Sequence, residues 1–213
     1  MILPRSFYFG DSRDVARNLL GQILVRETEE GVASGIIVET EAYLGTRDDA
    51  AHSYKGKTER VRALYGEKGA AYIYLIYGMY YCLNIASGPD GEPECVLIRA
   101  LQPLEGMDIM ARRRGTARSD NLCSGPGKLC QALAIDKSLY GADVTQKGPL
   151  YIVKGAAPEK IEATPRVGID YAFHTKDALW RFIVAGNAFV SGAKKKRALQ
   201  NSPQTIDENA KLL

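Results

Sequence analysis

The sequence predicts a mixed α/β (α+β) fold: a single domain around a curved antiparallel sheet, with a protruding β-hairpin and peripheral helices. Residues 72–84 (YIYLIYGMYYCLN) are rich in Tyr and Ile, which favour strands, and Gly78 interrupts them where a tight turn would join two strands. Residues 22–28 and 32–43 predict a second antiparallel pair, joined by a turn at 29–31. Several further short strands outnumber the predicted helices.

Composition allows one ordinary globular domain. The chain has 213 residues, of which 46% are hydrophobic and 25% charged, and this is enough to bury a normal core. We expect one domain over residues 1–213, with a flexible C-terminal tail from about residue 194. The net charge of +3 permits an anionic partner without demanding one. No signal-peptide pattern and no apolar run of roughly 20 residues is present, so we expect an intracellular protein that does not contact membranes.

The remaining elements follow from caps, apolar periods and turn residues. Asp11 or Ser12 can cap a short helix that Gly21 closes. Residues 44–70 are polar and glycine-containing, which predicts a long loop. Further strands are expected at residues 94–100, 150–154, 160–164, 166–169 and 179–184, and further helices at 104–114 and from 124 to about 135.

Cysteine and histidine are too sparse for a zinc site. The chain has four cysteines, without a CxxC pair, and two histidines. Cys82 and Cys95 lie in apolar strands, where buried free thiols are common. The sequence therefore predicts no metal, no cofactor and no disulfide.

One strand carries carboxylates into an apolar environment. Alternation along residues 36–43 (IIVETEAY) places Ile37, Glu39, Glu41 and Tyr43 on one face. Buried carboxylates are costly unless they are partnered or functional. The alternative is an exposed strand end with solvated acids.

The hairpin has an apolar tip. Alternation aligns Tyr72 with Tyr74 on one face, while Tyr77 and Met79 flank Gly78 at the turn. Because turn tips are normally polar, an apolar tip indicates insertion into a partner. A buried central hairpin with a tucked-in turn remains the alternative.

Basic residues offer several anion contacts. Ser124 can cap the helix that begins in SGPGK (124–128), and Lys128 lies at this helix start, where free N–H groups favour anions. The spacing is not that of a Walker sequence. Arg99 interrupts an apolar strand and needs a carboxylate or an anion. The cluster 194–197 (KKKR) can touch phosphate or simply be solvated.

Together these features resemble the alkyladenine DNA glycosylase family. The similar stretches extend along almost the whole chain, whereas residues 54–63 and 139–165 match less well. The stretches are IVETEAYLG (37–45), AAHS (50–53), YIYLIYGMYYCLNI (72–85), VLIRALQPLEG (96–106), LCSGPGKLCQALAI (122–135) and RVG (166–168).

The resemblance implies a role for each matched residue. Glu41 would be the general base for the attacking water, which Arg99 and the Val167 backbone would help to position. Tyr77, beside Met79, would intercalate where the damaged nucleotide leaves the duplex, and Asn84 would exclude the 2-amino group of guanine. The base pocket would comprise Ala42, Tyr43, His52, Tyr74 and Asn84, and the phosphate-facing side would comprise Ser124, Gly125, Lys128 and Lys137.

The resemblance implies a metal-free, monofunctional and monomeric enzyme that binds double-stranded DNA containing damaged purines. Two rival functions use the same residues differently. A non-catalytic binding module would use the tyrosines as a stacking platform, but it would gain nothing from Glu41 inside an aromatic cleft. A metal-dependent nuclease would use Glu39, Glu41, Asp48 and Asp49, and resistance to a chelator would exclude it.

Overall fold

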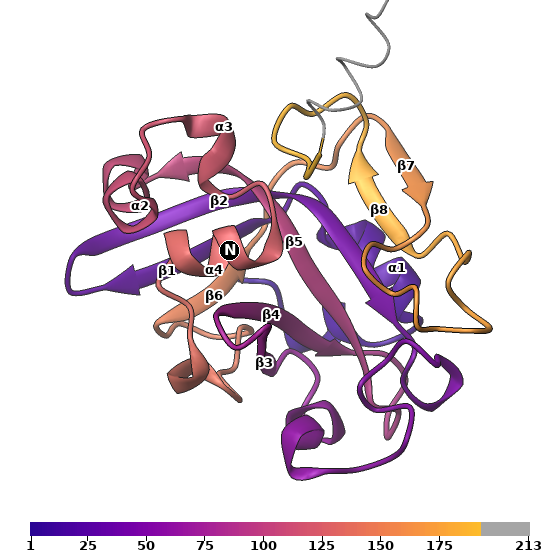
Figure 1. Cartoon of the computed structure of the whole chain (residues 1–213). Helices are drawn as coiled ribbons and strands as arrows, with labels where there is room; N and C mark the ends of the chain where they lie inside the picture. Colours follow the sequence, from indigo (N-terminus) through magenta and orange to yellow (C-terminus); the bar gives the residue numbers. More distant parts are fainter. Residues whose placement is uncertain (193–213) are drawn as a thin grey trace, which may run out of the picture.

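A computed structural model describes residues 1–192, and the predicted tail from about 194 with its basic cluster 194–197 lies outside these described residues. The fold is a single domain built on a strongly curved antiparallel sheet, with helices at its periphery (Figure 1). The strand order is β3-β4-β5-β2-β1-β6, and β8 pairs with both β2 and β7. The predicted fold class is confirmed.

The elements agree with most predicted segments. The strands are β1 (Ile23–Thr28), β2 (Gly31–Tyr43), β3 (Ala71–Ile76), β4 (Tyr80–Ser87), β5 (Glu94–Glu105), β6 (Leu150–Val153), β7 (Ile161–Thr164) and β8 (Arg181–Val184). The α-helices are α1 (Ser12–Leu19), α2 (Met107–Arg114), α3 (Ser119–Leu122) and α4 (Pro126–Ala132). None of the helices in residues 1–192 combines the length and apolarity that crossing a bilayer requires.

Some predicted boundaries are wrong. The helix expected at 104–114 begins only at Met107, because β5 continues to Glu105 and Gly106 turns the chain. The 44–70 loop contains two 3₁₀ helices, η2 (Gly45–Arg47) and η3 (Glu59–Tyr65). Residues 166–169 are not a strand, and residues 167–168 form a bend. Ser124 does not cap α4, because Gly125 occupies the N-cap position without a side-chain hydrogen bond and Ser124 forms a bridge with Ala100.

Strand β2 is the centre of the sheet. Its first half pairs with β1, its second half pairs with β8, and β5 runs along its other edge. Register shifts lie between Ile37 and Glu39 and between Glu39 and Thr40. Such bulges exchange the faces of a strand. Ile37 therefore packs in the main core rather than on the face of Glu39 and Glu41, where simple alternation predicted it.

Helices α1 and α4 cover the core side of the sheet. Asp11 accepts a hydrogen bond from the Arg13 backbone and caps α1, as predicted, and Val15 and Leu19 are buried beneath it. At the start of α4, a Cβ on Gly127 would lie only 3.0 Å from the Cβ of Tyr80. Glycine therefore permits the close packing of α4 on the hairpin, which brings the 124–128 segment beside β4.

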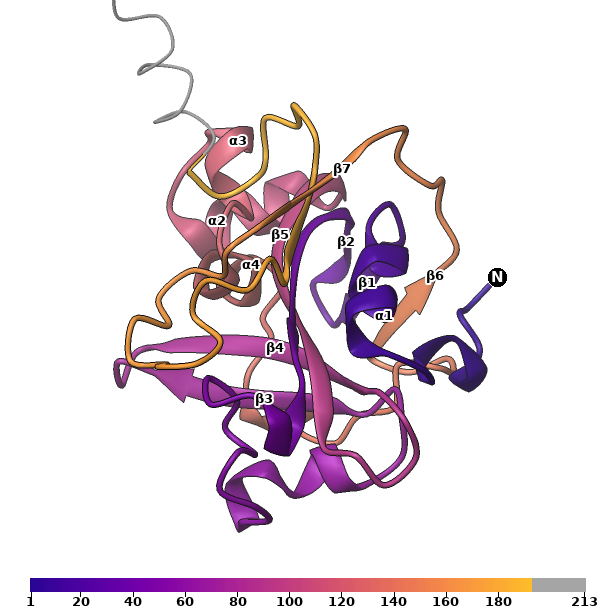
Figure 2. The ribbon, with the colours of Figure 1, turned by 90° about the vertical axis from the view of Figure 1, so that its right-hand side faces the viewer.

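Hairpin β3–β4 projects from the rest of the sheet, as Figure 2 shows from the side. Tyr77 at its tip has a φ of 54°, and its side chain is 79% exposed; Met79 is 66% exposed. The hairpin and its exposed apolar tip are thus confirmed, and the tucked-in turn is wrong.

Candidate active site

Glu41 lies on β2 with its side chain fully buried, and three donors face its carboxylate. The backbone N–H of Val167 donates to Oε1 at 2.8 Å, and the hydroxyl of Tyr43 donates to Oε2 at 2.9 Å. The Arg99 guanidinium lies 3.3 Å from Oε2. Burial and then the Glu41 carboxylate raise the pKa of Tyr43 well above its usual value, so Tyr43 remains a hydroxyl donor at neutral pH.

Arg99 joins Glu41 to a second buried carboxylate. Its Nε donates to Glu39 at 2.7 Å, and Arg181 donates to the same Glu39 oxygen at 2.7 Å. The Ser191 backbone donates to the other oxygen of Glu39 at 2.7 Å. Burial opposes the charge on Arg99, but the carboxylates of Glu41 and Glu39 outweigh it and raise the pKa of Arg99. The predicted need of Arg99 for a carboxylate is confirmed.

The three partners of the Glu41 carboxylate, Tyr43, Arg99 and Val167, line an aromatic cavity, and Glu41 lies behind them. The volume of the cavity is about 590 Å³, within the range of roughly 300–1,000 Å³ that is typical of ligand sites. Tyr43, His52 and Tyr74, all predicted pocket residues, line it together with Arg99 and Val167. Hairpin β3–β4, the loop residues 49–55 and the 167–171 segment contribute most of the lining.

The aromatic wall is held by its own contacts. The His52 and Tyr74 rings meet edge to face with centroids 4.5 Å apart, and His52 Nδ1 lies 2.8 Å from the Tyr72 hydroxyl. Burial and then the charge of Arg60 lower the pKa of His52 to about 4. The imidazole is therefore neutral at pH 7, so it adds no positive charge to the cavity.

The other predicted pocket residues are placed differently. Asn84 lies deeper, in a recess of about 30 Å³ that Tyr43, His52 and Tyr74 also line, and its amide donates to the Tyr72 carbonyl at 3.2 Å. Ala42 points to the opposite face and packs in the main core, because successive side chains of a strand alternate. It therefore does not line the cavity, contrary to expectation. Tyr77 lies at the mouth of the cavity, and Met79 lies across the hairpin turn.

The four residues predicted to face phosphate do not line the cavity. Lys128 donates to the Asn121 side chain at 2.6 Å, while Lys137 is exposed. Ser124 and Gly125 are partly exposed directly before Pro126, which lines the cavity. Of the four, Ser124 and Gly125 are therefore adjacent in the chain to a residue of the cavity wall.

The four carboxylates of the nuclease alternative do not converge on a common point. Asp48 accepts both terminal nitrogens of Arg166, and Asp49 accepts the backbone N–H groups of residues 173–175. Within residues 1–192, no three His, Cys, Asp or Glu side chains gather in a way that could hold a metal ion. All four cysteines are buried and free.

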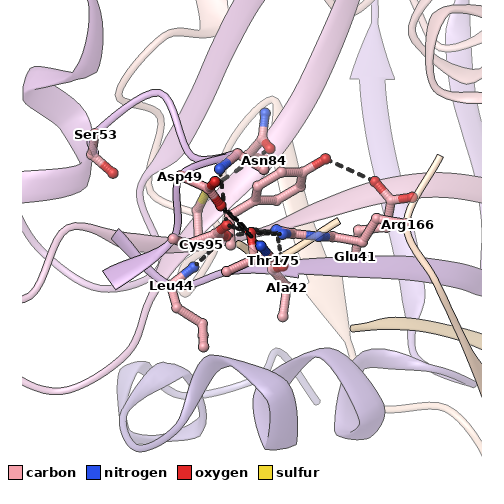
Figure 3. Close-up of polar contacts among 12 residues, drawn as sticks. Glu41, Ala42, Leu44, Asp49, Ser53, Asn84, Cys95, Arg166 and Thr175 are labelled. Carbon is pink, nitrogen blue, oxygen red and sulfur yellow. Dashed lines mark hydrogen bonds and ion pairs between the residues drawn. The ribbon is translucent and has the colours of Figure 1, made fainter. Parts of the chain in front are cut away.

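Residues not singled out from the sequence complete the site. Arg166 is buried against the faces of Tyr43 and Trp180, 4.6 Å and 4.9 Å from their ring centroids, and it is paired with Asp48. Figure 3 shows Arg166 and Glu41 close together with Ala42 and Thr175. Arg166 is the first residue of the matched stretch RVG (166–168), which was the only sequence signal for it.

Comparison with known proteins decides the family. The model of the methylpurine-DNA glycosylase family matches residues 6–188. The chain belongs to this family. It is accordingly a DNA glycosylase, a monofunctional hydrolase of N-glycosyl bonds, as the sequence resemblance implied.

Curated relatives cover nearly the whole chain. A protein of Methanocella arvoryzae, named "Putative 3-methyladenine DNA glycosylase", is 50% identical over 193 residues, which are 89% of this chain and 96% of the relative. Proteins with the same name from Clostridium tetani and Oceanobacillus iheyensis are 48% and 47% identical, over 90% and 89% of this chain and 99% and 95% of their own lengths.

Proposed function

We propose that this glycosylase rotates alkylated or deaminated purines, of the 3-methyladenine, 7-methylguanine and hypoxanthine class, out of duplex DNA and hydrolyses the N-glycosidic bond. An abasic site would remain, and base excision repair would begin. The observation that carries the proposal is the buried Glu41 carboxylate, oriented by Val167 and Tyr43 beside an aromatic cavity. A non-catalytic binding module would have no use for such a group.

Extrusion of the base is supported by the aromatic residues. Removing a nucleotide from the stack costs a few kcal/mol. The exposed Tyr77 can fill the gap, and stacking on Tyr43 and Tyr74 can return roughly 1–3 kcal/mol per contact. A purine alkylated at N3 or N7 is cationic, and electron-rich rings beside a neutral His52 favour a cation further.

Hydrolysis then needs a carboxylate below the sugar. As the base departs, the deoxyribose becomes an oxocarbenium-like cation, which the negative Glu41 stabilises. The oxygen of a water then bonds to the anomeric carbon, and Glu41 takes a proton from that water. Arg99 and the Val167 backbone would orient the Glu41 carboxylate and position the attacking water beside it. General-base assistance contributes roughly 10²–10⁴ in rate.

The experiment is an excision assay on duplexes that carry one defined 3-alkyl, 7-alkyl or deaminated purine. We expect release of the free base and an uncut strand that breaks only after alkali treatment. Full activity in EDTA is expected, since the chemistry needs no metal. Strand cleavage that EDTA abolishes would favour the nuclease, and binding without base release would favour the stacking module. Under this proposal the enzyme acts on DNA inside the cell, as a monomer.

The exposed Tyr77 leads to a prediction about binding. Tyr77→Ala should weaken binding to duplex with a lesion or an abasic site by roughly 1–3 kcal/mol, because a stacking contact is lost. The melting temperature should barely change, since the side chain is 79% exposed. Fluorescence anisotropy and thermal denaturation test both parts. A large fall in melting temperature, or unchanged binding, would contradict the role of Tyr77 as a wedge.

The buried Asn84 leads to a prediction about selectivity. Asn84→Ser should enlarge the recess of about 30 Å³ and increase excision of undamaged guanine, because the 2-amino group gains space. Release of normal guanine is measured against release of 7-methylguanine, which should be unchanged. If the ratio stays constant, Asn84 does not exclude guanine.

A further inference from the structure

We propose that Arg166, held by Asp48, is the positioning residue that orients Glu41. The inference rests on the proposed function, because it assigns Arg166 to the step in which Glu41 acts. Arg166 touches neither cavity nor substrate, and it acts through Val167 and Tyr43, which donate to opposite oxygens of the Glu41 carboxylate.

The Arg166 guanidinium is fixed in position and orientation. Its two terminal nitrogens donate to the two oxygens of Asp48 at 2.6 and 2.8 Å, and both side chains are fully buried. The same nitrogens also donate to the Ala42 carbonyl at 3.0 Å and to the Thr175 hydroxyl at 3.1 Å. A planar bidentate pair of this kind fixes geometry as well as charge.

Asp48 is itself fixed by the backbone of its own loop. Its oxygens accept the N–H groups of Leu44 at 3.1 Å and Ala50 at 3.0 Å. The carboxylate therefore joins the end of β2 to the segment that carries His52. The contacts of Leu44 and Thr175 with this pair come from different parts of the chain.

Arg166 acts on Oε2 of Glu41 through the aromatic ring of Tyr43. Its guanidinium carbon lies over the Tyr43 ring, 4.6 Å from the centroid, and over the Trp180 ring, 4.9 Å from the centroid. Contact with the guanidinium restricts the Tyr43 ring, whose hydroxyl donates to Glu41 Oε2. The same ring lines the cavity, so one residue supports both the base contact and the carboxylate.

Arg166 acts on Oε1 of Glu41 through the main chain. Val167 follows it directly, and the Val167 N–H belongs to the peptide group that joins the two residues. This N–H donates to Glu41 Oε1 at 2.8 Å. Residues 166–169 belong to no strand, and 167–168 form a bend, so no sheet pairing orders this segment and the contacts of the Arg166 side chain supply that order.

The contacts of Arg166 require the forked shape of the guanidinium as well as its positive charge. Nε of Arg166 is buried and has no hydrogen-bond partner in the described structure, although a buried donor normally finds one. The two terminal nitrogens hold all the contacts. A lysine would retain the positive charge but could not form the fork, so Arg166→Lys should not restore the function.

The test is single-turnover excision of hypoxanthine from duplex DNA at saturating enzyme. Arg166→Met and Arg166→Lys should each lower the rate about 10²-fold, the effect of a displacement of about 1 Å at a reacting group. Affinity for an abasic-site duplex should change less than 3-fold, because the groups that touch DNA remain. Rates are measured at a temperature at which circular dichroism shows each variant to be folded.

Arg113→Met is the matched control. Arg113 is another largely buried arginine, which donates to Thr28 and to the Ala132 carbonyl far from the cavity. It should lose stability as the Arg166 variants do, yet keep its rate within about 2-fold. Loss of rate and affinity together in the Arg166 variants, or an equal loss of rate in Arg113→Met, would overturn the proposal.

A double variant separates positioning from a general structural role. In a Glu41→Gln background, Arg166→Met should cost less than 3-fold in rate, because the group it orients is already lost. If the two effects multiply instead, Arg166 does not act through Glu41 and the inference is wrong. If Glu41→Gln excises normally, the proposed function fails first, which distinguishes the two failures.

Discussion

Glu41→Gln should lower excision by at least about 10², the lower end of the range for general-base catalysis, while lesion-containing duplex is bound about as well as by the parent. The amide keeps the shape of the side chain but loses the negative charge and the ability to accept a proton. Under the proposed function, phosphate contacts and stacking supply the affinity, and the Glu41 side chain makes neither kind of contact.

Neutral and cationic lesions should suffer equally in Glu41→Gln. Both leave the same cationic sugar to be met by water, so the loss depends on the sugar rather than on the base. Single-turnover release of hypoxanthine and of 7-methylguanine measures this, with binding followed separately by anisotropy. Normal excision of both by the variant would refute the catalytic role of this strand.

Glu39→Gln should have the largest effect on stability. The Glu39 carboxylate is fully buried and accepts hydrogen bonds from Arg99, Arg181 and Ser191. Burial opposes its charge, but the two arginines outweigh burial and lower the pKa of Glu39. Removing one partner of a buried ion pair costs roughly 3–5 kcal/mol. The melting temperature should therefore fall by roughly 10 °C or more.

The effect of Glu39→Gln on excision should be much smaller than that of Glu41→Gln. Glu39 contacts neither Tyr43 nor Val167, the cavity residues that donate to Glu41, so its loss reaches the reaction through the shared Arg99. The matched control is Glu30→Gln, which removes a half-exposed partner of Arg113 and should cost no more than about 1 kcal/mol. A dead but stable Glu39→Gln beside an active Glu41→Gln would show that the base is assigned to the wrong glutamate.

The sequence by itself determined the elements whose patterns are local. Tyr and Ile around a central glycine specify hairpin β3–β4, and the apolar tip of that hairpin is exposed because it lies beyond the last pair of the two strands, Ile76 with Tyr80. Alternation placed Glu41 and Tyr43 on one face correctly, since the last residues of β2 pair regularly with β5. The resemblance then supplied roles that no local pattern contains.

Only the tertiary structure decided what surrounds those residues. The bulge beside Val38 moved Ile37 to the other face, and a bulge depends on pairing with β5 rather than on the strand's own residues. Ser124 lost its capping role to a bridge with Ala100 for the same reason.

Arg166 shows the limit most clearly. Arg166 lies 118 residues from Asp48 and 124 residues from Ala42 along the chain. The next residue, Val167, donates its backbone N–H to Glu41, which is 126 residues away. Periodicity and spacing describe residues that are close along the chain. A buried charge needs a partner because the interior has a low dielectric constant, and the fold decides which distant residue that partner is. The sequence therefore determined which face carries the carboxylate, and the folded chain decided what holds it.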